Sequence, residues 1–222
     1  MDTCIRIHER DGILYRRAII DDFIDDTFSV YNIIKEAGEL RSVSGKRLFY
    51  YVEDVDLYRR LLKGNPNVVA LDREEIVGYC ISDVSQSGMC NMISAIEASL
   101  VNAEARGYVE ENQKVNPDWR IEGTYTDWKR FMCGDSFIFK TYSVKRKAQG
   151  RGIGYEMGKQ VLKHMYIAGK RYGYVTVHPE NSASINILSK LGFVFLWRNE
   201  NLYGGQPRLI GILDMSRSLR VG

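Results

Sequence analysis

A glycine-rich segment between a predicted strand and a predicted helix constrains this chain more than any other feature. The run 137-FIFKTYSV-144 is rich in β-branched and aromatic residues and predicts a strand. The segment 144-VKRKAQGRGIGYEM-157 follows it, and from Met157 to Met165 apolar residues recur at helical spacing. A strand, a glycine loop and a helix in this order let backbone amides at the helix N-terminus face a phosphate group.

The side chains of this loop suit an anionic ligand. Its glycines carry no Cβ atom that would block a close approach of the backbone to a phosphate. The basic residues Lys145, Arg146, Lys147 and Arg151 add a cationic field. On its own, the loop is also compatible with a glycine-rich turn surrounded by solvated basic side chains.

The register of the glycines separates three kinds of phosphate-binding loop. A P-loop requires GxxxxGK[ST], and no Gly-Lys-Ser/Thr occurs here. A dinucleotide-binding GxGxxG motif fails because Met157 stands where the third glycine should be, and no acidic residue follows about 20 residues later. The third pattern, [RQ]-x-x-G-x-[GA] directly after a strand, is met by Gln149, Gly152 and Gly154.

A second motif, 175-VTVHPENSASINILSKLGF-193, stands downstream of the loop and its helix. Together the two segments resemble the acyl-CoA-binding region of the GNAT acetyltransferase superfamily, and the long middle segment gives a further resemblance to the arylalkylamine N-acetyltransferase-like branch. The resemblance implies an α/β fold with a mixed, mostly antiparallel central sheet, splayed parallel strands, flanking helices and a helical insertion. The residues that match the second motif are Asn181, Ser184, Ile185, Lys190, Leu191, Gly192 and Phe193.

The resemblance also implies where coenzyme A, supplied as acetyl-CoA, binds. In the family the loop amides face the coenzyme's pyrophosphate, the backbone of the preceding strand bonds the pantetheine arm, and the Asn of the second motif contacts the cofactor. Asn181 is also placed to cap a helix, and the two roles are compatible. The cofactor-binding positions carried over are Tyr142, Ser143, Val144, Gln149, Gly150, Arg151, Gly152, Ile153, Gly154, Tyr155, Asn181 and Ser184.

The sequence departs from the family at the residue that protonates the leaving thiolate. The usual tyrosine position is occupied by Leu188, which has no proton to donate. A thiol has a pKa near ~8.5, so its thiolate is already a fair leaving group at neutral pH. The candidate substitutes for the missing acid are water, Tyr142, Ser189 and Tyr203.

An acceptor amine must also lose a proton before it attacks a thioester, because an alkylamine pKa of about 10.4 keeps it protonated at neutral pH. His178 stands just past a predicted strand and titrates near neutral pH, which makes it a candidate base. The alternative interpretation is an exposed histidine at a strand end, before Pro179. Further candidate bases are Glu36, Glu39, Glu122 and Asp127.

The whole chain predicts a single acyl-CoA N-acyltransferase domain over residues 1–222, with an insertion at 85–136 between the third and fourth core strands. The element order is β-α-α-β-β-insertion-β-α-β-α-β-β, with hairpins at 4–18 and 68–84 and a turn at 203–207. Four acidic residues are expected on the solvated first turns of the first helix, where they interact favourably with the helix dipole. The alternative is that these residues attract a cationic substrate. These residues are Asp21, Asp22, Asp25 and Asp26.

The middle segment is aromatic, which suits either an apolar amine site or packing of the insertion on the sheet. We therefore predict an N-acetyltransferase that transfers acetyl from acetyl-CoA to a primary amine of a small molecule, by direct attack in a ternary complex. The alternatives are a protein N-terminal or lysine acetyltransferase, a non-catalytic acyl-CoA-binding module, and an interaction domain whose glycine loop binds no coenzyme A. The aromatic candidates are Trp119, Tyr125, Trp128 and Phe131.

Composition narrows the location and the partners. A net charge of +3 is too small for a protein that coats nucleic acid. Four cysteines without a CxxC pair indicate free thiols, and three scattered histidines give no metal-ligand spacing. No signal-peptide pattern and no apolar run of about 20 residues occur. We expect a cytoplasmic protein that binds no membrane, nucleic acid or metal. Whether two copies of the chain form a homodimer is left open.

Overall fold

The computed structural model describes residues 6–19, 21–24, 30–40, 45, 55–62, 65–100 and 134–215. The chain divides into two compact units, and each unit contains a hydrophobic core cluster of its own. The first unit consists of Met1–Asp83 and Phe139–Ala168, and the second of Val84–Ile138 and Gly169–Gly222. That the chain works as one functional domain stays a prediction.

The first unit is built on an antiparallel sheet. In spatial order its strands are β1 (Arg6–Arg10), β2 (Ile13–Arg17), β3 (Val68–Asp72), β4 (Glu75–Asp83) and the C-terminal part of β5 (Ser136–Val144). The β1–β2 hairpin turns through Asp11 and Gly12, which both have positive φ, as a two-residue hairpin turn requires. Both hairpins predicted for this part of the chain are confirmed.

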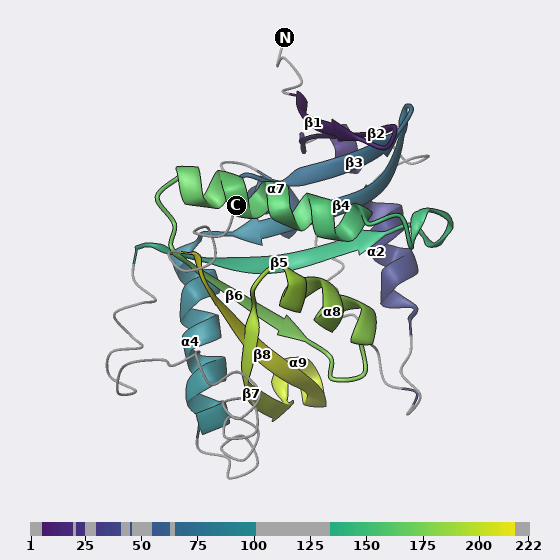
Figure 1. The fold of residues 1–222 in the computed structure, drawn as a ribbon. Helices are drawn as coiled ribbons and strands as arrows, with labels where there is room; N and C mark the ends of the chain where they lie inside the picture. Colours follow the sequence, from purple (N-terminus) through teal and green to yellow (C-terminus); the bar gives the residue numbers. More distant parts are fainter. Residues whose placement is uncertain are drawn as a thin grey trace. The chain divides into compact units, whose positions relative to one another are not determined.

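Helices pack on both faces of this sheet. They are α2 (Val30–Gly38), α3 (Val55–Leu62) and α7 (Ile153–Ile167), and the short α1 (Asp21–Ile24) contacts α2. Figure 1 shows α7 lying along β3 and β4. Successive strand residues face opposite sides of a sheet. Gly78 of β4 faces α7, whereas Tyr79 lies in the core cluster with Ile33 and Ile34 of α2. The strand pattern therefore fixes α7, and with it the glycine loop, on one face of the first unit.

One acidic residue departs from the expected solvated helix start. Asp22 is 6% exposed, and its carboxylate accepts two hydrogen bonds from the Arg16 guanidinium, one of them at 2.7 Å. It also accepts the Ile19 N–H at 2.7 Å. The expectation is wrong for Asp22, because the buried Arg16 near the end of β2 pairs with it. Asp21 is exposed as expected, and Asp25 and Asp26 lie outside the described residues.

The second unit combines one parallel pairing with antiparallel ones. Its strand order is β5, β6 (Tyr172–Val177), β8 (Gln206–Asp214) and β7 (Val194–Asn201). β5 pairs with β6 in parallel through Ser136–Ile138 and Tyr172–Tyr174, while β8 runs antiparallel to both of its neighbours. The helices of this unit are α4 (Gln86–Leu100), which packs on β7, α8 (Ser182–Lys190) and the short α9 (Leu202–Gly205).

The predicted fold class, a mixed α/β protein with a mostly antiparallel sheet and flanking helices, is confirmed. The turn expected at 203–207 is instead the helix α9, which runs directly into β8. Of the predicted insertion, only residues 85–100 and 134–136 are described. The divergence of the two parallel strands beyond their ladder stays a prediction. Within the described ranges, no helix is long and apolar enough to cross a membrane.

Candidate functional site

The glycine loop of the first unit is held by its own backbone and by one side chain. Lys145 N–H donates to the Val77 carbonyl at 2.8 Å, and residues Arg146–Ala148 then form one turn of 3₁₀ helix. Gln149 Nε2 returns to the Val144 carbonyl at 3.0 Å, which closes the loop against the end of β5. The first residue of the predicted Gln-Gly-Gly triplet therefore has a structural role, because it ties the loop to the strand.

Two glycines of the loop are required by backbone conformation. Gly150 has φ +80° and Gly152 has φ +75°, a region that residues with a Cβ atom rarely adopt. A Cβ atom at either position would meet no other heavy atom within 4 Å, so the space beside the backbone is open. The conformation thus demands glycine, and the open side of the loop is accessible to a ligand.

The N-terminus of α7 follows directly and presents backbone donors. Gly152 is the N-cap and provides no side-chain cap, and the first bond within the helix runs from Glu156 N–H to the Gly152 carbonyl at 3.1 Å. The amides of Ile153, Gly154 and Tyr155 precede that bond and have no acceptor in the helix itself. Together with the positive end of the helix dipole they suit an anion such as a pyrophosphate.

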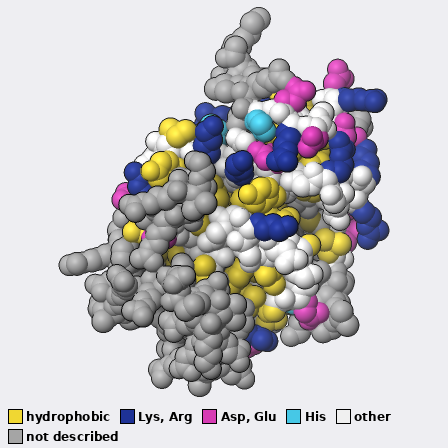
Figure 2. Space-filling view, viewed as in Figure 1, with side chains coloured by type: hydrophobic (Ala, Val, Ile, Leu, Met, Phe, Trp, Pro, Cys, Tyr) yellow, Lys and Arg dark blue, Asp and Glu magenta, His cyan; other side chains and the backbone are white. Residues whose placement is uncertain are grey.

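The loop cations make ion pairs that the sequence did not predict. Lys145 Nζ lies 3.0 Å and Lys147 Nζ 2.5 Å from the two carboxylate oxygens of Glu75, and Arg151 Nη1 lies 2.5 Å from Asp72 Oδ2. Hydrogen bonds from Lys147 and then Lys145 hold the pKa of Glu75 below its ordinary value. Figure 2 shows acidic and basic side chains interspersed over the upper part of this face. The only signal in the sequence was the polar hairpin turn 72-DREE-75.

The end of β5, expected to bond the pantetheine arm, is the least buried part of that strand. Tyr142, Ser143 and Val144 are half-buried, whereas the strand is mostly buried before them. The sequence missed the role of Gly78 on the neighbouring strand. A Cβ atom there would lie 2.9 Å from Met157 Cε and 3.2 Å from the Ser143 carbonyl oxygen. Gly78 therefore allows β4 to lie close to both α7 and the Ser143 backbone.

In the second unit, Asn181 is the N-cap of α8. Its Oδ1 accepts a hydrogen bond from Ser184 N–H at 3.1 Å, which satisfies one of the amides left over at the start of the helix. Among the described residues no acceptor is assigned to its Nδ2 group. The capping role predicted for Asn181 is confirmed, and its contact with the cofactor stays a prediction.

His178 is buried at the end of β6. The side chain is 1% exposed, Nδ1 accepts the Glu180 N–H at 3.1 Å, and the carbonyl accepts the Asn181 N–H at 2.9 Å. The alternative of an exposed histidine is wrong, because the following turn folds back over the residue. A neutral imidazole that accepts at Nδ1 carries its proton on Nε2. To act as a base, His178 must give up the Glu180 bond, and this role stays a prediction.

The motif ending KLGF is a helix C-cap. Gly192 has φ +94°, Phe193 N–H donates to the Leu188 carbonyl at 3.0 Å, and Gly192 N–H donates to the Ser189 carbonyl at 3.0 Å. These two bonds define a Schellman motif, in which apolar residues at the Leu188 and Phe193 positions commonly pair. Leu188 is fully buried and Phe193 nearly so. Leu188 is therefore a core residue, and it provides no acid.

The remaining candidates fall into two groups. Tyr142 packs edge-on against Phe139 with ring centroids 5.5 Å apart. Ser189, Glu36 and Glu39 are exposed. Outside the described residues or side chains lie Glu122, Asp127, Trp119, Tyr125, Trp128, Phe131 and the Tyr203 side chain. Over the described ranges, no three His, Cys, Asp or Glu residues are placed to hold a metal ion.

Comparisons with known proteins agree with this geometry. Residues 124–194 match the family described as the acetyltransferase (GNAT) domain, and no curated protein sequence matches the chain. Similar solved structures include yncA from Salmonella typhimurium with its cofactor acetyl-CoA, at 15% identity and TM-score 0.57, covering 91% of this chain and 94% of that one. Ribosomal-protein-alanine N-acetyltransferase from Brucella melitensis is similar at 15% identity and a TM-score of 0.57, covering 90% of this chain and 99% of that one. A chain of the NatC complex bound to Gag peptide and CoA is similar at 13% identity and a TM-score of 0.56, covering 91% of this chain and 98% of that one. At such identities the structural likeness establishes the fold.

Proposed function

We propose that this chain, whose residues 124–194 match the GNAT acetyltransferase domain, is an acyltransferase of that type and transfers an acetyl group from acetyl-CoA to the primary amine of a small molecule. The single observation that carries the proposal is the glycine loop with the α7 N-terminus. Gly150 and Gly152 hold the loop at positive φ, and the first amides of α7 have no acceptor in the helix. Such a site suits the pyrophosphate of the acyl donor.

The chemistry assigned to the chain is direct transfer. The neutral amine nitrogen attacks the carbonyl carbon of the thioester and forms the C–N bond. The C–S bond then breaks and its electron pair remains on sulfur, while the nitrogen loses one proton to a base or to water. Holding both substrates together lowers the barrier by making the attack effectively unimolecular.

Proton transfer in this chain differs from the family pattern in one respect. Leu188 is a buried core residue and donates no proton, so the thiolate leaves unassisted or takes its proton from water or another hydroxyl. General acid catalysis contributes about 10²–10⁴-fold when it is present. We therefore propose a slower enzyme than a tyrosine-bearing relative, with a rate that rises with pH as more of the amine becomes neutral.

A second candidate acceptor is a protein N-terminus. It is favoured by the structural likeness to a ribosomal-protein-alanine N-acetyltransferase and to the NatC complex bound to a Gag peptide. An N-terminal α-amine has a pKa near 7.7–8.0, so roughly a tenth or more of it is neutral at about pH 7, compared with far less than a hundredth of an alkylamine. This acceptor class needs less help from a base.

The test is an acceptor panel read by mass spectrometry, which is insensitive to the thiols of the protein itself. Acetyl-CoA is incubated with alkylamines, arylalkylamines and short peptides that begin with Ala or Met. Acetylation of an amine class supports the small-molecule proposal, and acetylation of peptides alone moves the assignment to a protein acceptor. Tight coenzyme A binding without any product would identify a non-catalytic binding module.

A matched pair of variants ties the activity to the loop. Gly152→Ala and Gly169→Ala both add a Cβ atom at positive φ, +75° and +83°, where no other atom lies within 4 Å. The backbone strain is therefore similar, about 1 kcal/mol in each case. Only the first change touches the loop, and it should weaken coenzyme A binding at least tenfold while Gly169→Ala does not. Equal affinities would contradict the placement of the pyrophosphate.

A further inference from the structure

The cations of the glycine loop already hold two carboxylates from another part of the first unit. Glu75 lies between Lys145 and Lys147 at 3.0 and 2.5 Å, and Asp72 pairs with Arg151 at 2.5 Å. Asp72 ends β3 and Glu75 begins β4, so both flank the β3–β4 turn, 70 to 79 positions earlier in the chain than the cations. Arg146 is exposed, and no ion pair is recorded for it among the residues that the structure describes.

These contacts place carboxylates where a phosphate ligand would seek its partners. An ammonium or guanidinium group that pairs with a carboxylate is not fully available to a phosphate, because both anions compete for the same donors. The two carboxylates also offset two of the four positive charges of the loop. The cationic field expected from the sequence is therefore weaker than the count of basic residues implies.

Glu75 is the stronger competitor of the two. Its side chain is 26% exposed and holds two lysines, one of which, Lys145, is only 15% exposed. Charges that are partly buried interact through a lower effective dielectric and are less screened by salt. The Arg151–Asp72 pair is more open, at 42% and 36%, and so contributes less.

We infer that Glu75, with Asp72 in a lesser role, sets the affinity of this enzyme for its acyl-CoA donor by competing with the coenzyme's phosphates for Lys145, Lys147 and Arg151. This inference rests on the proposed function. The competition weakens the binding of acetyl-CoA and of the product coenzyme A equally, because both carry the same phosphates. It therefore speeds release of the spent coenzyme, while the ratio of the two affinities stays the same.

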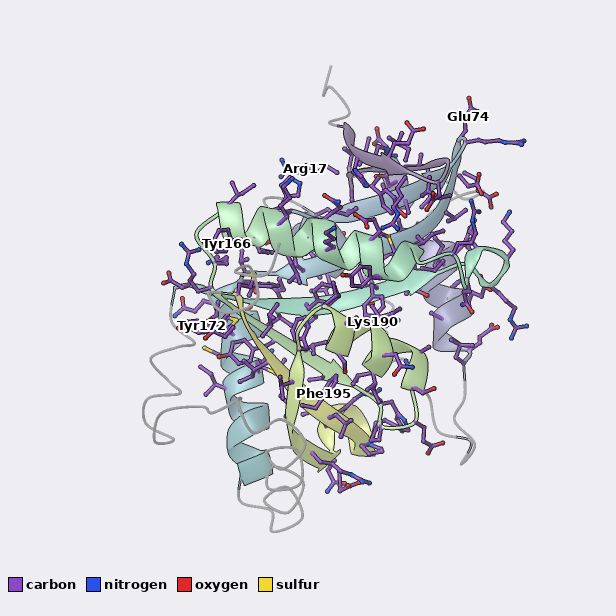
Figure 3. The ribbon with its side chains drawn as sticks, viewed as in Figure 1. Arg17, Glu74, Tyr166, Tyr172, Lys190 and Phe195 are labelled. Carbon is purple, nitrogen blue, oxygen red and sulfur yellow. The ribbon has the colours of Figure 1, made fainter. Side chains whose placement is uncertain are left out.

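The neighbouring residue provides a control of the same charge. Glu74 is exposed on the same turn, and Figure 3 labels it at the tip of the β3–β4 hairpin. No ion pair is recorded for Glu74 in the described part of the chain. Glu75→Gln and Glu74→Gln thus remove the same charge from adjacent positions, and only the first releases loop lysines.

The experiment measures dissociation constants by calorimetry for coenzyme A, its 3′-dephospho form and pantetheine. Glu75→Gln should lower the dissociation constant of coenzyme A about threefold to tenfold at low salt. The gain in affinity should be smaller for the dephospho form and absent for pantetheine. At about 0.5 M salt the affinities of the variant and the wild type should converge. Glu74→Gln should change the affinity less than about twofold. In Glu75→Gln the inhibition constant of coenzyme A and the KM for acetyl-CoA should fall together.

The Lys147→Met background guards against a purely structural effect. In this background the gain in coenzyme A affinity from Glu75→Gln should be smaller, because one of the two lysines for which Glu75 and the phosphates compete is gone. Unchanged or weaker binding by Glu75→Gln, an equal gain from Glu74→Gln, or an equal gain for pantetheine would overturn the inference while leaving the proposed function intact. Failure of wild type and all variants to bind coenzyme A would overturn both.

Discussion

Substitutions of Asn181 separate its two roles. The Oδ1 atom caps α8 through Ser184 N–H at 3.1 Å, and we predict that the Nδ2 group donates to the cofactor. Asn181→Asp keeps an oxygen at the capping position and replaces the donor by a second acceptor with a negative charge. Asn181→Ala removes the cap and the donor together. The pair of variants therefore distinguishes a helix cap from a cofactor ligand.

The magnitudes follow from the cap and the charge. Loss of an N-cap side chain costs about 1 kcal/mol, which for a chain of this length lowers Tm by about 2–4 °C. Asn181→Ala should show that loss. Asn181→Asp should keep or slightly raise Tm, since a carboxylate is favourable at a helix N-terminus. For coenzyme A, a lost donor and an added negative charge should weaken binding about tenfold to a hundredfold in Asn181→Asp.

The assay combines thermal unfolding with calorimetric titration of coenzyme A. Asn186→Asp is the control, because Asn186 is exposed on the same helix and gains the same charge. The reasoning requires Asn181→Asp to be stable and a poor binder, while Asn186→Asp stays close to wild type in both measurements. If Asn181→Asp binds coenzyme A as well as wild type does, Asn181 is a cap only, and the cofactor contact carried over from the family is refuted.

Three further predictions concern stability and packing. Asp22→Asn should lower the free energy of unfolding by about 3 kcal/mol in urea titrations, because it breaks a buried ion pair and leaves the arginine partner uncompensated, whereas Asp21→Asn should change it by less than about 0.5 kcal/mol. Gly78→Ala should raise KM for acetyl-CoA with a small change in Tm, since the new methyl group presses on the Ser143 carbonyl at 3.2 Å; an unchanged KM would refute that reasoning. Burial holds the pKa of His164 below its usual 6.5, so the unfolded chain binds the extra proton first and stability should fall as pH drops below about 6.5. His164→Gln should flatten this part of the pH–Tm curve, and an unchanged slope would assign it to other groups.

The sequence predicted best those parts of the structure that depend on local backbone geometry. The place of the glycine loop between strand and helix followed from residue types and register, and the structure adds that Gly150 and Gly152 have positive φ. The hairpins at β1–β2 and β3–β4 follow from alternation and turn residues, which act over a few positions. Gly192 likewise ends α8 where the sequence places the end of a helix.

The sequence could not predict contacts that depend on distant parts of the chain. Glu75 meets Lys145 and Lys147 across 70 and 72 positions, and nothing within either segment announces the other. Asp22 appeared to be one of several solvated acids, yet the chain reversal after β2 places it on the buried Arg16. The charge of a segment was therefore readable, while its electrostatic environment was not.

Leu188 shows how recognition of a fold and recognition of a mechanism separate. The ending KLGF describes a Schellman cap, with Gly192 at positive φ and the Leu188 carbonyl bonded to Phe193 N–H at 3.0 Å. That geometry favours an apolar residue at position 188, which is fully buried here. The segment therefore keeps its signature, and its place in the fold, whether or not position 188 can donate a proton. The signature identifies the α8 C-cap and its place in the fold, whereas the rate of the proposed transfer depends on groups that the signature does not contain.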